Sequence, residues 1–211
     1  MASKVQLRRD TYANWVSNNP TLAAGEQAYE TNTGLVKIGN GTTAYTSLAY
    51  LGPDVYRLTA DRSAIGATIA DYFASAAFTT LAGSVYLAEW ELFFTKTTAG
   101  TVTFTIASSQ APVNIAASYN GGPVAGIATA GAPITASIVA STSTAAALPA
   151  TSSLTTAVNH HFIVRALVET NATTAGTLKL QVTESAGTIT PLRGSTVTMR
   201  QLPNANYGSF A

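Results

Sequence analysis

Glu89 and Glu91 are the residues of this sequence whose type and spacing best match a pair of catalytic carboxylates. They flank Trp90 in a run that alternates like a strand, so both carboxylates point to one face. Paired carboxylates can act as acid and base across a glycosidic bond. However, no partner base, metal ligand or aromatic sugar platform accompanies them, and the apolar residues of the run fall on the opposite face. A solvent-facing strand surface therefore explains the pair better than catalysis.

The other chemically active residue types give no site either. His160 and His161 are adjacent, so on a strand they point to opposite faces and cannot jointly bind one metal. Cysteine is absent, which excludes disulfides and thiolate ligands. No phosphate-binding loop, nucleophile elbow or zinc-protease motif occurs. We expect a protein without catalytic residues, cofactor or metal.

The charge pattern argues against nucleic acid and membrane partners. Eleven basic residues face 10 acidic ones, so the chain has no strong net field. The small basic cluster of Lys4, Arg8 and Arg9 is followed at once by Asp10, which favours pairing with acidic groups on a protein. The N-terminus has no apolar core of a secretory signal. The sequence contains no run of about 18 apolar residues, so it predicts no membrane span.

A low content of charge points to an assembly. Only 10% of the residues are charged, and residues 97–164 contain no Asp, Glu, Lys or Arg. Soluble domains average about 25%. A long surface without charge is poorly protected against association, so we expect much of it to be buried against other protein.

The pattern of turns and strands predicts two domains. In residues 1–52, very short strands alternate with glycine turns at Gly34 and Gly39–Gly41. Such short strands bury little surface on their own. Seven apolar residues nevertheless follow one another closely there, and they predict a partner surface: Leu35, Val36, Ile38, Tyr45, Leu48, Tyr50 and Leu51.

Longer strands with alternating apolar residues predict an antiparallel β-sandwich of jelly-roll type over residues 55–211. The expected strands are residues 85–95, 101–107, 162–169, 177–183 and 197–202. The sequence Thr-Thr-Ala-Gly-Thr occurs at 97–101 and again at 173–177, which indicates two similarly built hairpins. Residues 108–158, rich in Ala, Ser, Thr and Gly, are expected to form a long ordered excursion, either an extra β-layer or an arm that reaches a neighbouring subunit.

The first 51 residues resemble a known module. Their pattern is R-x-x-T-x-x-x-W, N-P-x-L-x-x-G-E, E-T-N-T-G, K-I-G-N-G and Y-x-x-L, and it is similar to the N-terminal module of the phage major tropism determinant. The matching residues are Arg8, Thr11, Trp15, Asn19, Pro20, Leu22, Gly25, Glu26, Glu30, Thr31, Asn32, Thr33, Gly34, Lys37, Ile38, Gly39, Asn40, Gly41, Tyr45 and Leu48. Tyr45 stands where the family often has Trp.

The resemblance implies a fold and an interface. In that family the glycine-turn strands of three chains interleave into a trimeric β-prism, so that apolar side chains of one chain are buried against two others. The expected fold class is therefore all-β, with a trimeric β-prism-like module before the sandwich. The residues implied at the trimer or attachment interface are Arg8, Trp15, Leu22, Glu26, Tyr29, Leu35, Ile38, Tyr45 and Leu48.

These expectations combine into a homotrimeric, non-enzymatic phage virion protein. One role is capsid decoration, in which a cement protein binds the major capsid protein on the head surface. The alternative is a short tail fibre or receptor-binding protein that contacts tail proteins and a host surface receptor. The short chain, without a tail-anchoring domain or fibrous shaft, favours decoration. A glycan-cleaving fibre that uses Glu89 and Glu91 is the third hypothesis.

Overall fold

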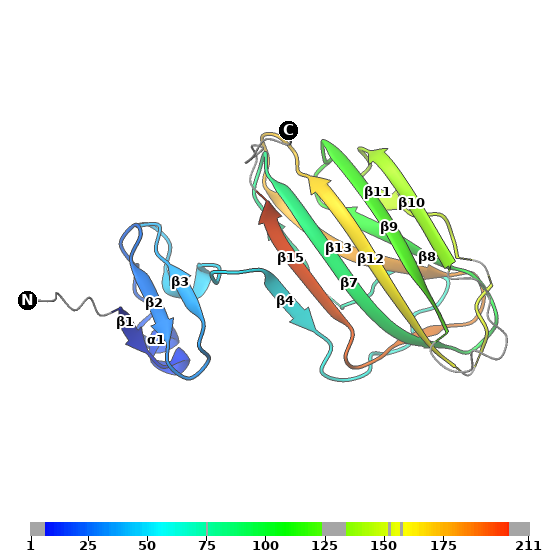
Figure 1. The fold of residues 1–211 in the computed structure, drawn as a ribbon, viewed down its shortest axis with the longest axis horizontal. Coiled ribbons are helices and arrows are strands. Elements are labelled where there is room, and N and C mark those ends of the chain that lie inside the picture. Colours follow the sequence, from blue (N-terminus) through cyan, green and yellow to red (C-terminus); the bar gives the residue numbers. More distant parts are fainter. Residues whose placement is uncertain (1–6, 75, 124–133, 152, 157, 203–211) are drawn as a thin grey trace, which may run out of the picture. The chain divides into compact units, whose positions relative to one another are not determined.

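The chain folds into two compact units, residues 1–54 and 55–211 (Figure 1). A computed structural model describes residues 7–74, 76–123, 134–151, 153–156 and 158–202. The fold is all-β, with 51% strand and 6% helix. Each unit has its own core of buried side chains.

The first unit is a three-stranded sheet with one short helix. Its elements are β1 (Arg8–Asp10), α1 (Tyr12–Asn18), β2 (Gln27–Glu30), β3 (Val36–Ile38) and the 3₁₀ turn η1 (Tyr45–Ser47). The order is β1-β2-β3, with β1 parallel and β3 antiparallel to β2. The hydroxyl of Thr11 caps α1 by accepting from the Asn14 amide, and Asn19, in the left-handed region at φ 38°, ends it.

The second unit is built from two antiparallel sheets. The long sheet has the order β10-β9-β12-β7-β15-β4, and β14 pairs with β7. Its strands are β4 (Asp54–Arg57), β7 (Val85–Lys96), β9 (Asn114–Pro123), β10 (Ile134–Ser141), β12 (Asn159–Glu169), β14 (Ile189–Pro191) and β15 (Thr196–Leu202). The short sheet has the order β11-β8-β13-β5, and β6 pairs with β13. Its strands are β5 (Ala70–Asp71), β6 (Phe78–Thr80), β8 (Val102–Ser108), β11 (Ala145–Ala147) and β13 (Gly176–Glu184).

Alternating side chains fill the space between the two sheets. In β7 every second residue from Tyr86 to Lys96 is buried, as the period of two predicts. Phe104 of the short sheet packs against Phe94 and Phe162 of the long one, with ring centroids 6.5 and 5.4 Å apart. One apolar cluster joins both sheets, so the unit is a two-layer sandwich. The antiparallel sheets agree with the sequence prediction, and the jelly-roll assignment stays a prediction.

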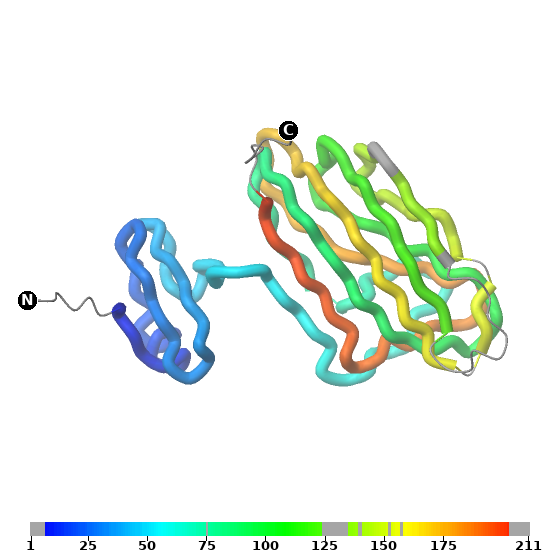
Figure 2. The backbone as a smooth tube through the Cα atoms, viewed as in Figure 1, coloured from blue at the N-terminus to red at the C-terminus, as the bar shows by residue number. Residues whose placement is uncertain are grey.

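The two Thr-Thr-Ala-Gly-Thr segments are not hairpins. The first joins β7 to β8 and the second joins β12 to β13, and in both cases the two strands belong to different sheets. The colour ramp of Figure 2 follows this path from one layer to the other. The two strand pairs then lie side by side, because β7 pairs with β12 and β8 with β13. The sequence echo therefore marks two similar arches between the sheets, which lie at opposite ends of the sandwich because β7 and β12 are antiparallel.

The expectation of an excursion at 108–158 is also wrong for the described part of this segment. Strand β9 lies inside the long sheet, between β12 and β10, and β11 extends the short sheet beside β8. On β9, Ile115, Ala117 and Tyr119 are buried in the common core. These residues are part of the sandwich itself, not an added layer or an arm. Residues 124–133 lie outside the described residues.

Two adjacent glycines of β9 provide a matched test of this packing. A Cβ on Gly121 would lie 2.3 Å from the His161 carbonyl oxygen and 2.5 Å from Cγ of Phe162, whereas a Cβ on Gly122 would meet nothing within 4 Å. We expect Gly121→Ala to cost about 1–3 kcal/mol of stability, because the core must shift to admit the methyl group. Gly122→Ala is expected to be neutral or slightly stabilising. Thermal unfolding of both variants checks this, and equal melting temperatures would contradict the packing.

Candidate assembly site

The core of the first unit is a stack of side chains around Trp15. The indole of Trp15 packs on the Tyr45 ring at a centroid distance of 4.9 Å and an angle of 15°. The Arg8 guanidinium also lies over the Trp15 ring, 5.1 Å from its centroid, and forms an ion pair with Glu26 at 2.9 Å. Leu22, like Trp15 and Tyr45, is buried. This small core forms within a single copy of the chain.

Beside this stack lies a group of polar residues around a buried carboxylate, which we call the Glu30 cluster: Glu30, Thr33, Lys37, Tyr45 and Tyr50. The carboxylate of Glu30 is fully buried and accepts hydrogen bonds from all three hydroxyls, at 2.7 Å from that of Tyr50. Nζ of Lys37 lies between the two tyrosine rings, 4.5 Å from each centroid, and donates to the Tyr45 carbonyl at 2.9 Å. A buried charge needs such partners to offset its lost hydration.

The Glu30 cluster shifts several pKa values. Burial works to raise the pKa of Glu30, but the three hydroxyl donors and the charge of Lys37 outweigh it, so this pKa lies below its ordinary value of 4.5. Burial lowers the pKa of Lys37, against the pull of Glu30. Burial, and then the hydrogen bonds to Glu30, raise the pKa values of Tyr45 and Tyr50. The cluster thus stabilises Glu30 as a carboxylate.

This electrostatic arrangement predicts that the first unit unfolds in acid. A carboxylate with a depressed pKa stabilises the folded state above its unfolded pKa, and this contribution is lost as the pH falls from about 4.5 through the folded value. Glu30→Gln should be less stable at pH 7 and should show a flatter decline in acid. The fluorescence of Trp15, measured in a Trp90→Phe background, reports this unit. An unchanged acid transition in Glu30→Gln would contradict the role of Glu30.

Several large apolar side chains of the first unit remain exposed in the single chain. Tyr12 and Val16 lie one turn apart on α1, and Leu35 and Ile38 lie at β3 with exposures of 43% and 38%. Leu51 is 65% exposed. Such a concentration in a small unit is typical of an interaction surface. Together with Leu7, these residues form what we call the apolar set.

The structure divides the interface residues expected from the sequence into two groups. Trp15, Leu22 and Tyr45 are buried within one chain, so they support the unit internally. The remaining residues are exposed or partly exposed: Arg8, Glu26, Tyr29, Leu35, Ile38 and Leu48. The expectation that all seven apolar residues of 35–51 need a partner is wrong for Tyr45, which one chain buries by itself. Leu35, Ile38 and Leu51 are exposed in the single chain, and their need for a partner stays a prediction.

In the second unit, the charge-free segment forms one flank of the sandwich. It supplies β9 and β10 at one edge of the long sheet and β8 and β11 at the corresponding edge of the short sheet (Figure 1). The two edges are joined where the Tyr119 hydroxyl donates to the Pro149 carbonyl at 3.0 Å. An edge strand without charge or proline offers unpaired backbone groups to another chain. This flank is a second candidate contact surface.

On the outer face of the long sheet, each of the two glutamates contacts a side chain of β12. Glu89 contacts Arg165, and Glu91 lies 3.1 Å from Nε2 of His161, whose ring stacks on Phe93 at 4.6 Å. Both carboxylates are thus turned to solvent and paired across strands. His160, by contrast, is fully buried, so the two histidines do point to opposite faces as predicted.

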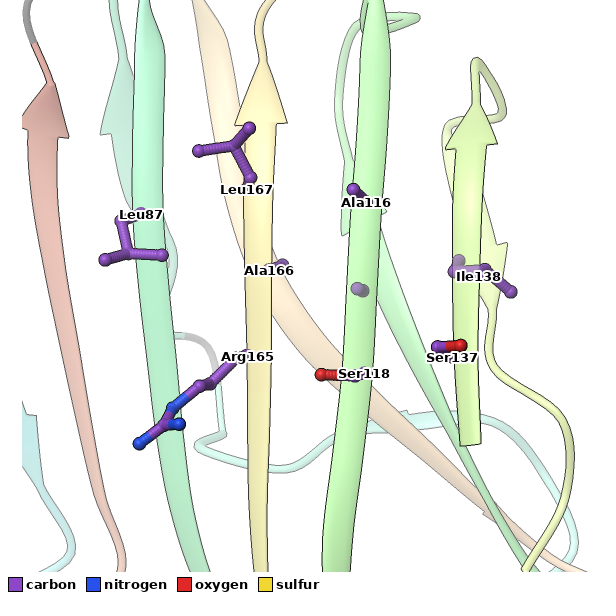
Figure 3. A pocket seen from close by; sticks show the side chains of 9 residues that line it. Leu87, Ala116, Ser118, Ser137, Ile138, Arg165, Ala166 and Leu167 are labelled. Atoms are coloured by element: carbon purple, nitrogen blue, oxygen red, sulfur yellow. The ribbon is translucent and has the colours of Figure 1, made fainter. Parts of the chain in front are cut away.

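Next to these pairs, the long sheet has a shallow hollow of about 260 Å³. Figure 3 shows it among β7, β12, β9 and β10, with Leu87 and Leu167 at one end and short side chains such as Ala116, Ser118 and Ser137 across the rest. Short side chains leave this space open. Its lining offers van der Waals contact and hydroxyl hydrogen bonds, which suit binding.

Within the described ranges, no group of three or more His, Cys, Asp or Glu side chains is placed to hold a metal ion. Among those same residues, no helix has the length and apolar character needed to cross a membrane.

Comparison with known proteins identifies the first unit. Residues 5–43 match the family model described as the major tropism determinant N-terminal domain, so the resemblance of this unit is confirmed. No curated protein matches the chain. A solved structure with weak similarity is described as "Structure of infectious bursal disease virus Gx strain", with 13% identity and a TM-score of 0.19. That match covers 78% of this chain and 44% of the other, so the chain spans less than half of that protein's length.

Two buried residues of the first unit were not expected at the site. Glu30 and Lys37 belong to the matching pattern, but the pattern gave no reason to place them in a buried cluster. A signal was present for Glu30, because it stands two residues after Ala28 and therefore on the same face of β2. The second unit contains a similar surprise, the buried pair Lys96 and Glu184.

Proposed function

We propose that this chain is a non-enzymatic structural protein of a bacteriophage particle, that it assembles as a homotrimer, and that it decorates the capsid as a cement protein. The match of residues 5–43 to a phage tropism-determinant domain is the observation on which this proposal rests. At the coarser level, the match and the all-β fold together favour a phage structural protein.

The apolar set supports trimer formation. In a β-prism built from three copies, the exposed side chains Leu35, Ile38 and Leu51 of each chain would be covered by the other two. Burying apolar surface is worth about 25 cal/mol per Å². Trp15, Leu22 and Tyr45 then keep their places inside each copy, so assembly needs no unfolding of the unit.

The charge-free flank favours the capsid as the partner. A surface of small uncharged side chains, with the open edge strand β10, can lie closely on a neighbouring protein without desolvating charges. In this proposal the major capsid protein is that neighbour. Contacts of this kind brace adjacent subunits and resist internal pressure.

A receptor-binding role on the tail is the second candidate. The family description speaks of tropism, and the hollow on the long sheet gives a place for contact with a host surface receptor. In this case the first unit would attach to tail proteins. Purified chain would then bind host cells, and heads without it would be as stable as heads that carry it.

Copy number per particle separates the two roles. Quantitative mass spectrometry of purified virions should find hundreds of copies for decoration, because the shell repeats its binding position many times. A few dozen copies or fewer would contradict decoration and favour the tail. Adding the purified chain to heads that lack it should raise their resistance to heat, while an equal amount of heat-unfolded chain serves as the control.

The proposed absence of enzymatic activity has its own test. The double variant Glu89→Gln, Glu91→Gln should leave particle stability and infectivity unchanged, because each carboxylate only forms a partly exposed cross-strand contact. Release of reducing sugars from host capsule or cell-wall glycans measures the alternative. Depolymerisation by the native chain that the double variant lacks would establish the glycan-cleaving fibre instead.

A further inference from the structure

Lys96 and Glu184 form a pair of charged residues with no exposed side-chain surface. Lys96 ends β7 and Glu184 ends β13, so the pair joins the two sheets at one end of the sandwich. Each continues the inward-facing row of its strand, in a position where the preceding residues are apolar. Lys and Glu are almost never fully buried unless paired.

The carboxyl group of Glu184 is held between an amine and an amide donor. Nζ of Lys96 contacts Oε2, and the backbone amide of Ala186 donates to Oε1 at 3.0 Å. Gly100 leaves the space for this arrangement, since a Cβ there would lie 2.9 Å from Oε1. A fixed amide donor on a carboxyl oxygen stabilises negative charge that develops on that oxygen.

His160 supplies a proton acceptor on β12, the strand beside β7. It is fully buried and stacks on Phe94 at 5.3 Å, and its register partner Phe94 lies two residues before Lys96 on the same face of β7. Burial lowers the pKa of His160, which favours the neutral ring. Nε2 lies 3.0 Å from the Thr155 carbonyl, which can only accept, so Nε2 bears the hydrogen. Nδ1 is then the free base, and it has no hydrogen-bond partner within the described part of the chain.

We propose that Lys96 and Glu184 form an intramolecular isopeptide bond between Nζ and Cδ. Burying an ammonium and a carboxylate away from water costs free energy. Transfer of one proton from the ammonium to the carboxylate removes both charges and gives a neutral amine and a neutral acid. The amine lone pair attacks Cδ, and the charge that develops on Oε1 is stabilised by the Ala186 amide. Nζ gives up a proton, Nδ1 of His160 relays it, and Oε2 leaves as water. An ammonium and a carboxylate thus become one amide and one water, with no change in oxidation state.

The arrangement favours this reaction for a physical reason. Bringing two groups together in a fixed geometry removes the entropic cost of their encounter, and folding itself supplies that geometry here. A desolvated lysine is also the usual state of a nucleophilic amine in proteins. The product would join β7 to β13 covalently across 88 positions of the chain.

Mass spectrometry of the full chain tests the proposal. The denatured native chain should be lighter than its sequence by the mass of one water, and trypsin should release a branched peptide that joins the segments around Lys96 and Glu184, because an acylated lysine is not cleaved. A native chain of full mass, or a linear peptide that ends at Lys96, would show a buried ion pair only and would overturn the proposal.

Three variants exclude other sources of a water loss. Lys96→Met should restore the full mass of its sequence, whereas a loss of water elsewhere, for example from a cyclised Asp, would keep the deficit. Lys179→Met removes a partly exposed ion-paired lysine of the same unit and should retain the crosslink. His160→Phe should accumulate uncrosslinked chain that still shows the native circular dichroism. If His160→Phe crosslinks at the native rate, His160 does not relay the proton. The bond itself is tested separately, by the branched peptide.

Discussion

Lys96→Met is expected to lower the free energy of unfolding of residues 55–211 by about 3–5 kcal/mol, the usual cost of leaving one member of a buried pair alone. Met has nearly the length of Lys and keeps the packing, so the loss comes from the missing link to Glu184 and not from a cavity. The Glu184 carboxyl keeps the Ala186 amide as a donor, but it loses the amine on its other oxygen. Native-state hydrogen exchange of the amides in β7 and β13 measures this unit separately from the first.

The double variant Lys96→Met, Glu184→Leu separates two origins of that stability. If the pair acts only through charge, an apolar replacement of both members should be neutral or stabilising. If a covalent bond closes the 88-residue loop, its removal should still cost about 4–5 kcal/mol through chain entropy. Lys179→Met is the control, with an expected effect below about 1 kcal/mol, because its partner Asp71 and the lysine are partly exposed. A Lys96→Met chain as stable as the native one would contradict both accounts.

The same pair shows where sequence patterns stop being informative. Alternation of apolar residues predicted a strand over 85–95, and the structure ends β7 at Lys96, one residue later. A lysine at an inward position normally marks the end of a buried row. Its partner stands 88 positions away on a strand of the other sheet, and no local pattern connects the two. Contacts that depend on tertiary packing are therefore missed, although the strands that carry them are found.

Small residues made β9, an inner strand of the long sheet, hard to recognise from the sequence for a similar reason. The alternation in β9 consists of Ile115, Ala117, Tyr119 and Gly121, and only two of these are large. The segment was therefore expected to be an ordered excursion outside the sandwich and not one of its strands. In the structure, Gly121 has to be small because Phe162 of the neighbouring strand occupies the space where its side chain would be. The reason for the weak pattern is thus a contact with a residue 41 positions further along the chain.

The turn residues helped to identify the first unit from the sequence, but they did not predict which of its side chains are buried. Glycines and asparagines at fixed spacing identified the module, because positive φ angles at Gly25, Gly34 and Gly41 leave little choice of residue. Which apolar residues face inward depends on how α1 packs on the sheet. Tyr45 was expected at a partner surface, and the stack with Trp15 buries it within one chain instead.

Replacing Leu35 and Ile38 by Lys is expected to convert the proposed trimer into a folded monomer. Both side chains are exposed in the single chain, so the substitutions leave its core intact. Each side chain is already more than half covered, so assembly gains about 1 kcal/mol from each one. Two positions in three chains then amount to about 6 kcal/mol, or roughly a 10⁴-fold weaker trimer. Sedimentation velocity at micromolar concentration reads the oligomeric state directly.

The matched control is Leu81→Lys, which places the same charge at an exposed apolar position of the second unit. This variant should remain trimeric, because the interface is proposed to lie in the first unit. Loss of the trimer in Leu81→Lys but not in the double variant would move the interface to the sandwich. A native chain that sediments as a monomer at this concentration would contradict trimer formation altogether. The exposed residues of β3 would then have to be covered by a different protein, and the attachment partner would become the first question about this module.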